Sequence, residues 1–294
     1  MSPQRPAISQ QIEQKEALFS GSTKVSGKIA VLGAGRIGGI LLESFLRRGI
    51  ASNTDLLGTM QHAPKAAEAS RRLDVPINTD NPAAARAADV ILLCVKPQGL
   101  AALLEEIRPE LTPKKLLISV VASATTSYIE SRVGPSIPVM RAMPNTPATV
   151  GCGITAICKG TSATDAHMRT AQALFSSVGR VVAVEDAQMD AVTGLSACGP
   201  AYIYIILESL AEAGVKVGLP RELATQLAAQ TALGSAQVVL QTGNHPALLK
   251  DDVTTPGGCT IDGLLELEEG RLRVTLIKAV VKATQRAREL LLKE

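Results

Sequence analysis

The chain has 294 residues, 46% of them hydrophobic, which exceeds the usual size of one core and predicts two domains. Its 30 basic and 27 acidic residues are dispersed and leave a formal net charge of +3, and only three Tyr and three Phe could stack on bases, so we expect no nucleic-acid partner. The best apolar run, Ala201 to Leu210, is interrupted by Glu208 and is shorter than the ~20 residues that span a bilayer, so we expect no membrane insertion.

The cysteines and histidines indicate a reduced, metal-free protein. The five cysteines form no CxxC pair and sit among apolar or small residues, which is typical of reduced thiols and predicts a cytoplasmic location. His62, His167 and His245 are scattered in polar segments, so we predict no metal site.

Residues 1–26 are polar and lack the apolar core of a signal peptide, which predicts a tail or a short capping helix. Short apolar and β-branched runs then alternate with helical patterns up to about Val184. Unbroken runs such as VILLCV are typical of strands buried on both faces of a parallel sheet. The expected strands are Lys28–Leu32, Asp55–Thr59, Val90–Val95, Leu116–Val121 and Pro138–Ala142, and the expected helices are Arg36–Arg48 and Leu100–Ile107. Residues 27–186 are thus predicted to form an α/β, doubly wound (Rossmann-type) domain.

Beyond Asp186 the strand pattern disappears and helical patterns follow. They cover Ala201–Val217, Arg221–Thr242, Thr260–Glu268 and Arg271–Leu292. Their small-residue faces and the apolar stripe of the last helix exceed what one copy of the chain can cover. Residues 187–294 are therefore predicted to form an all-α C-terminal dimerisation domain.

A glycine fingerprint joins the first strand to the first helix. Gly33 permits a tight turn, Gly35 lets the backbone approach a pyrophosphate, and Gly38 allows the helix to pack closely on the strand. The strand and helix on either side favour dinucleotide binding over the alternative, a tight turn without a ligand.

The end of the second strand indicates which dinucleotide is bound. Thr59 is followed by His62 and Lys65, and no carboxylate there would repel a 2′-phosphate, although Asp55 lies close by. NADPH is therefore the predicted cofactor, with Thr59 as a donor to the 2′-phosphate and NADH as the alternative.

Two further strand ends belong to the same predicted edge of the sheet. Lys96 follows the strand Val90–Val95 and is predicted to line the cofactor cleft, the alternative being a solvated loop lysine. The MPNTP segment, Met143–Pro147, is interpreted equally well as a structural turn or as a binding segment.

The most informative segment is DDVTTPGGCTIDG, from Asp251 to Gly263. A Pro-Gly-Gly turn leads directly into an apolar helix pattern, so free backbone N–H groups and the Thr260 hydroxyl gather at a helix N-terminus, where an anion such as a small carboxylate can bind. An ordinary N-cap role for Thr260 explains the local pattern equally well.

Several separated motifs now identify a resemblance. The chain resembles the pyrroline-5-carboxylate reductase family from Lys28 to Leu292, in VKP at Val95–Pro97, MPNTP, DAVTGLSACGPAY from Asp190, GLPRELA from Gly218, and HPALLKDDVTTPGGCTIDGLLELE from His245. The resemblance implies hydride transfer from NAD(P)H to the C=N carbon of a cyclic imino acid, giving L-proline, the last step of proline biosynthesis. It also implies a homodimer or a larger ring of dimers.

The resemblance also implies roles for individual residues. Gly33, Gly35, Arg36, Ile37 and Gly38 would hold the pyrophosphate, Thr59 and Asn81 would face the adenosine ribose, and Val95, Lys96 and Pro97 would lie near the nicotinamide. Val253, Thr254, Pro256, Gly257, Gly258 and Thr260 would bind the imino acid, with Thr260 nearest its nitrogen and therefore assigned as catalytic. Ala197 and Cys198 depart from the Gly-Ser that is common in the family, which leaves the local polar contacts in doubt.

The chemistry agrees with a site that lacks a strong acid. An iminium carbon is already electrophilic, so the protein needs mainly to align the two reactants and to hydrogen-bond the nitrogen. Two alternatives stay open: a related imine or keto-acid reductase of the same architecture, and a non-catalytic NADPH-binding regulatory protein.

Overall fold

The computed structural model describes residues 24–289, which form two compact units. The first holds residues 24–198 together with 281–289, and the second is Gly199–Val280. Most of the predicted N-terminal tail, residues 1–26, lies outside the described residues.

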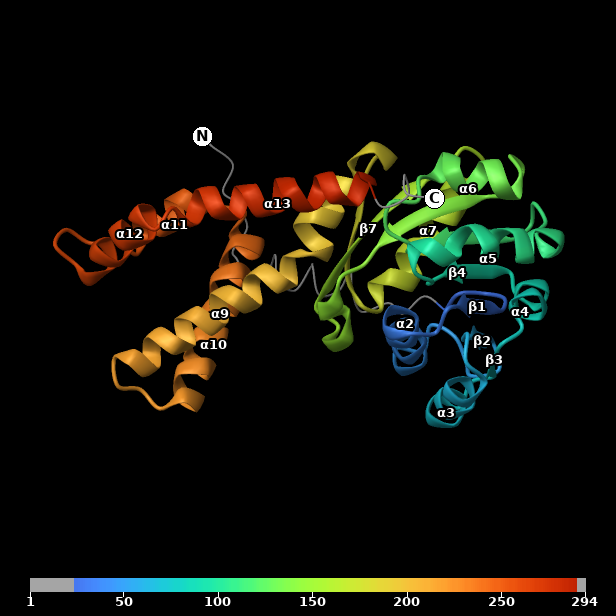
Figure 1. The fold of residues 1–294 in the computed structure, drawn as a ribbon, viewed down its shortest axis with the longest axis horizontal. Helices are drawn as coiled ribbons and strands as arrows, with labels where there is room; N and C mark the ends of the chain where they lie inside the picture. The colour runs from blue at the N-terminus through green and yellow to red at the C-terminus, as the bar shows by residue number, and fades with distance from the viewer. Residues whose placement is uncertain (1–23, 290–294) are drawn as a thin grey trace, which may run out of the picture. The chain divides into compact units, whose positions relative to one another are not determined.

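An eight-stranded sheet forms the centre of the first unit, in the order β3-β2-β1-β4-β5-β6-β7-β8 (Figure 1). The five predicted strands are present, each within a few residues of its expected ends. The observed bounds are β1 Ile29–Leu32, β2 Leu56–Thr59, β3 Ile77–Asn78, β4 Val90–Leu93, β5 Leu116–Ser119, β6 Val139–Met143, β7 Gly153–Lys159 and β8 Gly179–Ala183.

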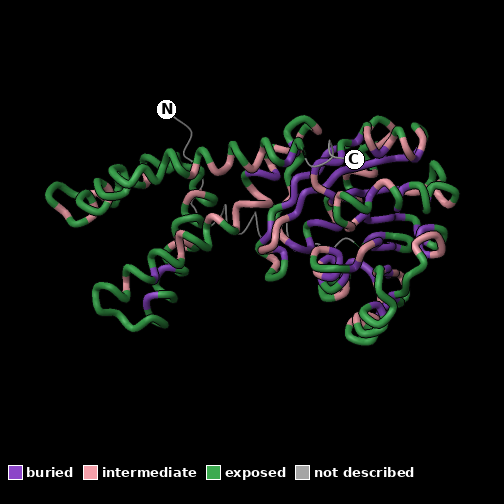
Figure 2. The backbone as a smooth tube through the Cα atoms, in the orientation of Figure 1, coloured by how far each residue is buried: buried purple, intermediate pink, exposed green. Residues whose placement is uncertain are grey.

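Helices cover both faces of this sheet, because alternate side chains of each buried strand point to opposite faces. In β1, Ile29 and Val31 belong to one core cluster, and Ala30 and Leu32 belong to the other. Figure 2 shows the buried residues as a band along the strands. The helices of the first face are α2 Arg36–Arg47, α3 Ala63–Leu73 and α7 Asp165–Ser176; those of the second are α4 Asn81–Ala87, α5 Leu100–Ile107 and α6 Thr126–Val133.

The sheet is mixed, whereas the sequence predicted a parallel one. β7 runs antiparallel to β6, and all the other pairs are parallel. The chain between β6 and β7 contains only the short 3₁₀ segment η3, Thr146–Val150, and a parallel return needs a crossover of about a dozen residues or more. The short connection therefore reverses the chain direction.

The second unit is helical, as predicted. Its helices are α9 Gly199–Lys216, α10 Arg221–Thr242, α11 Pro246–Asp252, α12 Cys259–Glu269 and the first half of α13 Leu272–Glu289. The bounds of α10 match the prediction. Few residues of this unit are buried, and most of its helices are coloured as exposed in Figure 2. Many of its large apolar side chains are exposed, among them Ile203, Ile205, Leu240, Leu265 and Ile277.

One helical stretch is more apolar than the sequence pattern suggested. Asp186–Lys216, 31 residues with a mean hydropathy of 1.3 in its most apolar window, is long and apolar enough to cross a membrane by length and composition. The interruption at Glu208 does not prevent this, because one charge changes the mean of a long window only slightly. Only 11% of that window is buried, so an extended apolar surface lacks a cover within the described chain.

The last turns of α13 rejoin the first unit through polar contacts. The Ser123 hydroxyl, in the loop after β5, donates to the Ala287 carbonyl at 2.5 Å, and Arg288 lies 3.9 Å from Asp190. Ser123 has a φ of 72°, a left-handed conformation that is costly for a residue with a side chain, and this hydrogen bond helps to hold it.

A buried ion pair holds the chain where it leaves the sheet. Arg141 on β6 is 2% exposed and donates to Asp186 at 2.5 Å, and the other Asp186 carboxylate oxygen accepts from the Thr126 backbone and hydroxyl, both at 3.2 Å. Burial, followed by the negative charge of Asp186, raises the pKa of the neighbouring Cys158 thiol to about 12, so it stays neutral. Asp186 therefore anchors the start of the helical stretch that leads to α9.

Replacing Asp186 with alanine is expected to lower the free energy of unfolding by about 3–5 kcal/mol, because it leaves the buried Arg141 guanidinium without its carboxylate. Chemical denaturation followed by circular dichroism measures this. Asp165→Ala is the matched control: its pair with Lys159 is on the surface, with Asp165 82% exposed, so the loss should stay below about 1 kcal/mol. Equal losses for the two variants would contradict the anchoring role.

Candidate functional site

The turn after β1 is closed by hydrogen bonds to the end of β2. Gly33 has a φ of 94°, which favours glycine, and its N–H donates to the Thr59 carbonyl at 3.1 Å. The Ala34 N–H donates to the same carbonyl at 2.7 Å. A Cβ on Gly33 would lie 2.9 Å from the backbone of Cys94, so the tight turn predicted from the sequence also lets the chain pass close to the end of β4.

The other two glycines differ in what surrounds them. A Cβ on Gly38 would collide with the Gly33 carbonyl oxygen and would lie 2.9 Å from Val31, because α2 packs directly on β1. A Cβ on Gly35 would meet nothing within 4 Å, so the backbone at Gly35 faces open space. This is the geometry that lets a phosphate approach the main chain.

The first turn of α2 suits an anion. No side chain caps this helix at Gly35, and its first turn contains no acidic residue. Arg36 is exposed there, and Ile37 is partly exposed. The N–H groups and the positive end of the helix dipole are therefore available to a negatively charged group.

Thr59 and Asn81 are hydrogen-bonded to each other, and the Thr59 side chain is buried. Thr59 is 1% exposed, and its hydroxyl donates to Asn81 Oδ1 at 2.6 Å. The expectation that this hydroxyl donates to a 2′-phosphate is therefore not met in this structure, because its only proton is already used. His62 and Lys65 are exposed after β2.

The end of β4 lies against the glycine turn. Val95 Cγ1 would be 3.0 Å from a Cβ on Gly33, while Lys96 is exposed at the start of the 3₁₀ segment η1, Pro97–Gly99. Burial raises the pKa of the Cys94 thiol to about 12, so this thiol next to the glycine turn is neutral. The structure thus brings Val95, Lys96 and Pro97 to the same sheet edge as the glycines.

The MPNTP segment has a structural role. The Asn145 side chain accepts from the Ile154 N–H at 3.0 Å and donates to the Ser196 carbonyl at 3.4 Å. It therefore ties the start of β7 to the π-helical turn Thr193–Ala197. Ala197, where the sequence departs from the family, packs against an apolar cluster that includes Met143 and Met189.

The predicted substrate loop lies wholly within the second unit. Gly257 has a φ of 67°, and a Cβ on it would meet nothing within 4 Å, so its backbone is open to a ligand. The Gly258 N–H donates to the Thr255 carbonyl at 3.0 Å, and the Thr254 hydroxyl donates to the Lys250 carbonyl at 2.7 Å. Val253 and Pro256 are exposed in the same loop.

Thr260 is not the N-cap of its helix, so the alternative interpretation of this residue as an ordinary N-cap is wrong. Gly258 occupies the N-cap position of α12 and Thr260 is the second residue of the helix. Thr260 is partly exposed, and within the described residues no hydrogen bond occupies its hydroxyl. The same first turn also contains an acidic residue, Asp262, which no sequence motif had singled out.

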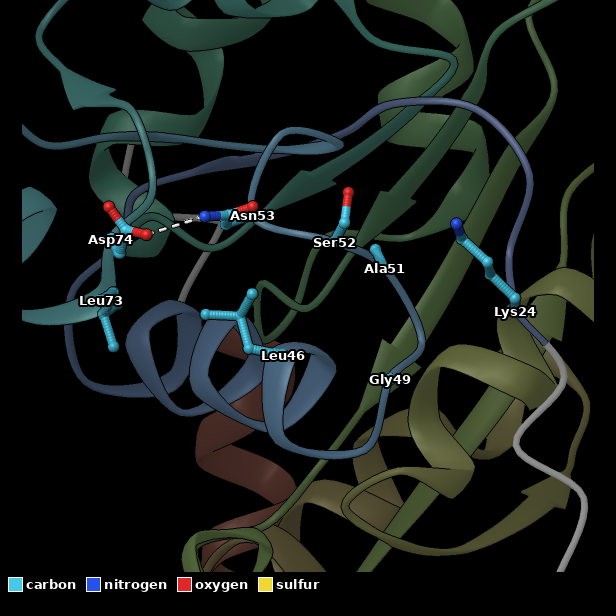
Figure 3. A pocket seen from close by; sticks show the side chains of 8 residues that line it. All are labelled: Lys24, Leu46, Gly49, Ala51, Ser52, Asn53, Leu73 and Asp74. Atoms are coloured by element: carbon cyan, nitrogen blue, oxygen red, sulfur yellow. Dashed lines mark hydrogen bonds between the residues drawn. The ribbon is translucent and has the colours of Figure 1, made fainter.

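A shallow pocket of about 500 Å³ lies elsewhere on the first unit (Figure 3). It is lined by residues from the ends of α2 and α3 and from the loops before β1 and β2, with Asn53 donating to Asp74 at 2.7 Å. These loops precede the strands, whereas ligands of doubly wound sheets bind where the strands end. This pocket is therefore separate from the glycine turn.

The described residues contain no group of three or more His, Cys, Asp or Glu side chains placed to hold a metal ion. All five cysteines are free.

Comparison with known proteins agrees with the geometry. A family model described as pyrroline-5-carboxylate reductase dimerisation matches residues 186–290, and one described as NADP oxidoreductase, coenzyme F420-dependent, matches residues 28–123. A pyrroline-5-carboxylate reductase of Methanosarcina acetivorans is 39% identical over 90% of this chain and 97% of its own length. One from Glycine max is 40% identical over 89% of this chain and 95% of its own.

Solved structures show the same relationship. A Plasmodium falciparum pyrroline carboxylate reductase with NADP bound has a TM-score of 0.84, is 30% identical, and covers 92% of this chain and 100% of that one. A pyrroline-5-carboxylate reductase from Coxiella burnetii has a TM-score of 0.82, is 33% identical, and covers 90% of this chain and 99% of that one.

The glycine turn, the sheet edge and the helical second unit define a dinucleotide-dependent oxidoreductase. Within that class, the chain belongs to the pyrroline-5-carboxylate reductase family.

The two neighbouring glycines of α2 provide a test of the turn. Gly38→Ala is expected to lower the melting temperature and weaken NADPH binding, because its methyl group would meet the Gly33 carbonyl, which cannot move without opening the turn. Gly39→Ala is the matched control: its nearest neighbour would be the Ala34 oxygen at 3.6 Å, an ordinary contact. Calorimetric titration with NADPH and thermal unfolding measure both variants, and equal behaviour would contradict the assigned packing.

Proposed function

We propose that this chain reduces 1-pyrroline-5-carboxylate to L-proline with NADPH as the hydride donor, the last step of proline biosynthesis. One observation carries the proposal: similarity to enzymes of that name extends through both the sheet unit and the helical unit, over about 90% of the chain. A match to the sheet unit alone would support only dinucleotide binding.

The residues around the turn fit the cofactor. Gly33, Gly35, Arg36, Ile37 and Gly38 would hold the pyrophosphate, because Gly35 faces open space and α2 has an uncapped N-terminus. Asn81 would contact the ribose while it holds Thr59 in place. Val95, Lys96 and Pro97 would lie near the nicotinamide. When bound, NADPH supplies the hydride that the protein itself lacks.

The loop before α12 supplies what the imino acid needs. Its carboxylate would be bound by the Gly257 N–H and by the uncapped N–H groups in the first turn of α12, at the positive end of the helix. Pro256 and Gly258 would shape the loop, because proline has no N–H and the Gly258 N–H is already bonded to the Thr255 carbonyl. Val253 and Thr254 would contribute shape and backbone contacts, because the Thr254 hydroxyl is already bonded to Lys250. The free Thr260 hydroxyl would hydrogen-bond the ring nitrogen, which keeps the C=N carbon electrophilic and positioned for attack.

The apolar helical surface is proposed to be covered by a second copy of the chain. The family model that matches residues 186–290 is one of dimerisation, and it includes the apolar stretch Asp186–Lys216. We therefore assign this surface to a homodimer or a ring of dimers rather than to a membrane. The free thiols support a reducing, cytoplasmic location.

The activity is tested by following NADPH and NADH oxidation with 1-pyrroline-5-carboxylate, pyrroline-2-carboxylate and a piperideine carboxylate. The proposal predicts the highest kcat/KM for 1-pyrroline-5-carboxylate, and a higher value with NADPH than with NADH. Preference for another imine would establish the related reductase, and NADPH binding without turnover of any imine would establish the regulatory protein.

The role of Thr260 predicts the behaviour of two variants. Thr260→Ala removes a hydrogen bond to a group that carries charge, worth about 1.5–3 kcal/mol, so kcat/KM should fall roughly tenfold to a few hundredfold. Thr260→Ser keeps the hydroxyl and should keep most of the activity. Steady-state kinetics measure the effect, and calorimetry should show unchanged NADPH affinity.

A threonine elsewhere in the unit is the control for Thr260. The Thr225 hydroxyl bonds the Arg221 carbonyl within α10, so Thr225→Ala should leave kcat/KM unchanged. If Thr260→Ala also stays within twofold of wild type while its melting temperature falls, Thr260 has a structural role only.

The apolar surface predicts an assembly that light scattering can measure. The protein should be at least dimeric at micromolar concentration, and Ile277→Glu, at a side chain that is 59% exposed in one copy, should weaken the assembly. A wild-type monomer that binds phospholipid vesicles would contradict this assignment.

A further inference from the structure

A chain of hydrogen bonds runs from α5 to the first glycine of the turn. The Asn81 Nδ2 group donates to Glu106 at 2.9 Å, the Thr59 hydroxyl donates to Asn81 Oδ1 at 2.6 Å, and the Gly33 N–H donates to the Thr59 hydroxyl oxygen at 3.3 Å. Glu106 lies in the last turn of α5 and is exposed. No sequence motif pointed to it.

The carboxylate at one end sets the direction of the two hydrogen bonds made by the Asn81 amide. An ionised carboxylate only accepts hydrogen bonds, so the Asn81 NH₂ group must face Glu106, and its oxygen must face Thr59. The single Thr59 proton is then given to Asn81, and its oxygen is left to accept from Gly33. Without Glu106 the amide could rotate by half a turn and release the Thr59 proton.

We propose that Glu106 is a positioning residue for the dinucleotide, acting through Asn81 and Thr59 on the turn at Gly33. This role rests on the proposed function, in which Asn81 contacts the ribose and the turn holds the pyrophosphate. Removing Glu106 leaves the fold in place, because Gly33 keeps its bond to the Thr59 carbonyl at 3.1 Å. Removal of Glu106 frees the Asn81 amide to rotate, so cofactor binding must then order this amide at a cost in affinity.

A direct electrostatic role for the same carboxylate makes the opposite prediction. A carboxylate close to the ribose would repel a 2′-phosphate, so its removal would strengthen NADPH binding and leave NADH binding unchanged. A positioning role acts on the shared part of both cofactors, so its removal weakens NADPH and NADH by similar factors.

The test is calorimetric titration of the full-length protein with NADPH and with NADH. Glu106→Ala should raise both dissociation constants by roughly 3- to 10-fold, the range expected for one hydrogen bond. Glu106→Gln keeps an oxygen acceptor but adds an NH₂ donor that no longer fixes the Asn81 amide, so its dissociation constants should lie between those of wild type and Glu106→Ala. Glu105→Ala is the matched control, because it removes an exposed carboxylate from the adjacent position of α5 and should also stay within twofold.

A double variant shows whether Glu106 acts through Asn81. If it does, Glu106→Ala combined with Asn81→Ala should bind NADPH no more weakly than Asn81→Ala alone. Additive losses, a Glu106→Ala protein that matches Glu105→Ala, or tighter NADPH binding would each overturn the positioning role. Wild-type protein that binds neither cofactor would overturn the proposed function together with it, whereas normal wild-type binding confines the failure to Glu106.

Discussion

The close approach of main chain at the glycine turn is the constraint on which the rest of the first unit depends. Gly38 sits against the Gly33 carbonyl and Val31, and Gly33 sits against the backbone of Cys94, with no space for a Cβ at either position. This contact sets where α2 begins on the sheet, and it leaves the uncapped helix N-terminus facing open space at Gly35. The proposed cofactor-binding surface is formed where the ends of β1, β2 and β4 meet.

The two units differ in how far they bury their apolar side chains. The sheet unit buries both faces of its strands under six helices and carries an internal ion pair where the chain leaves it. The helical unit leaves its large apolar side chains exposed in one copy. The family model that matches this unit is one of dimerisation, which is consistent with a second copy of the chain covering the exposed apolar surface. A high mean hydropathy in Asp186–Lys216 therefore reflects an interface as readily as a lipid-facing helix.

Residue spacing within a single segment was enough to predict the turns and helices that depend only on that segment. The glycine spacing identified the turn, and helical periodicity gave the bounds of α10. The reversal at β7 depends on the length of a connection, and β3 has only two residues, too few for a periodic pattern. Thr260 could be mistaken for an N-cap because helix ends shift by a residue or two. The Thr59–Asn81–Glu106 chain joins residues 22 and 25 positions apart, so only the fold brings it together.

The proposed activity requires a hydride to pass from the nicotinamide ring to the imine carbon of a five-membered imino acid. Reduction of 1-pyrroline-5-carboxylate with NADPH carrying deuterium at the transferred position of C4 tests it directly, with the product followed by mass spectrometry and proton NMR. The expected product is L-proline with one deuterium, located at C5, the former imine carbon. Proline without deuterium, deuterium at another carbon, or no proline at all would contradict it.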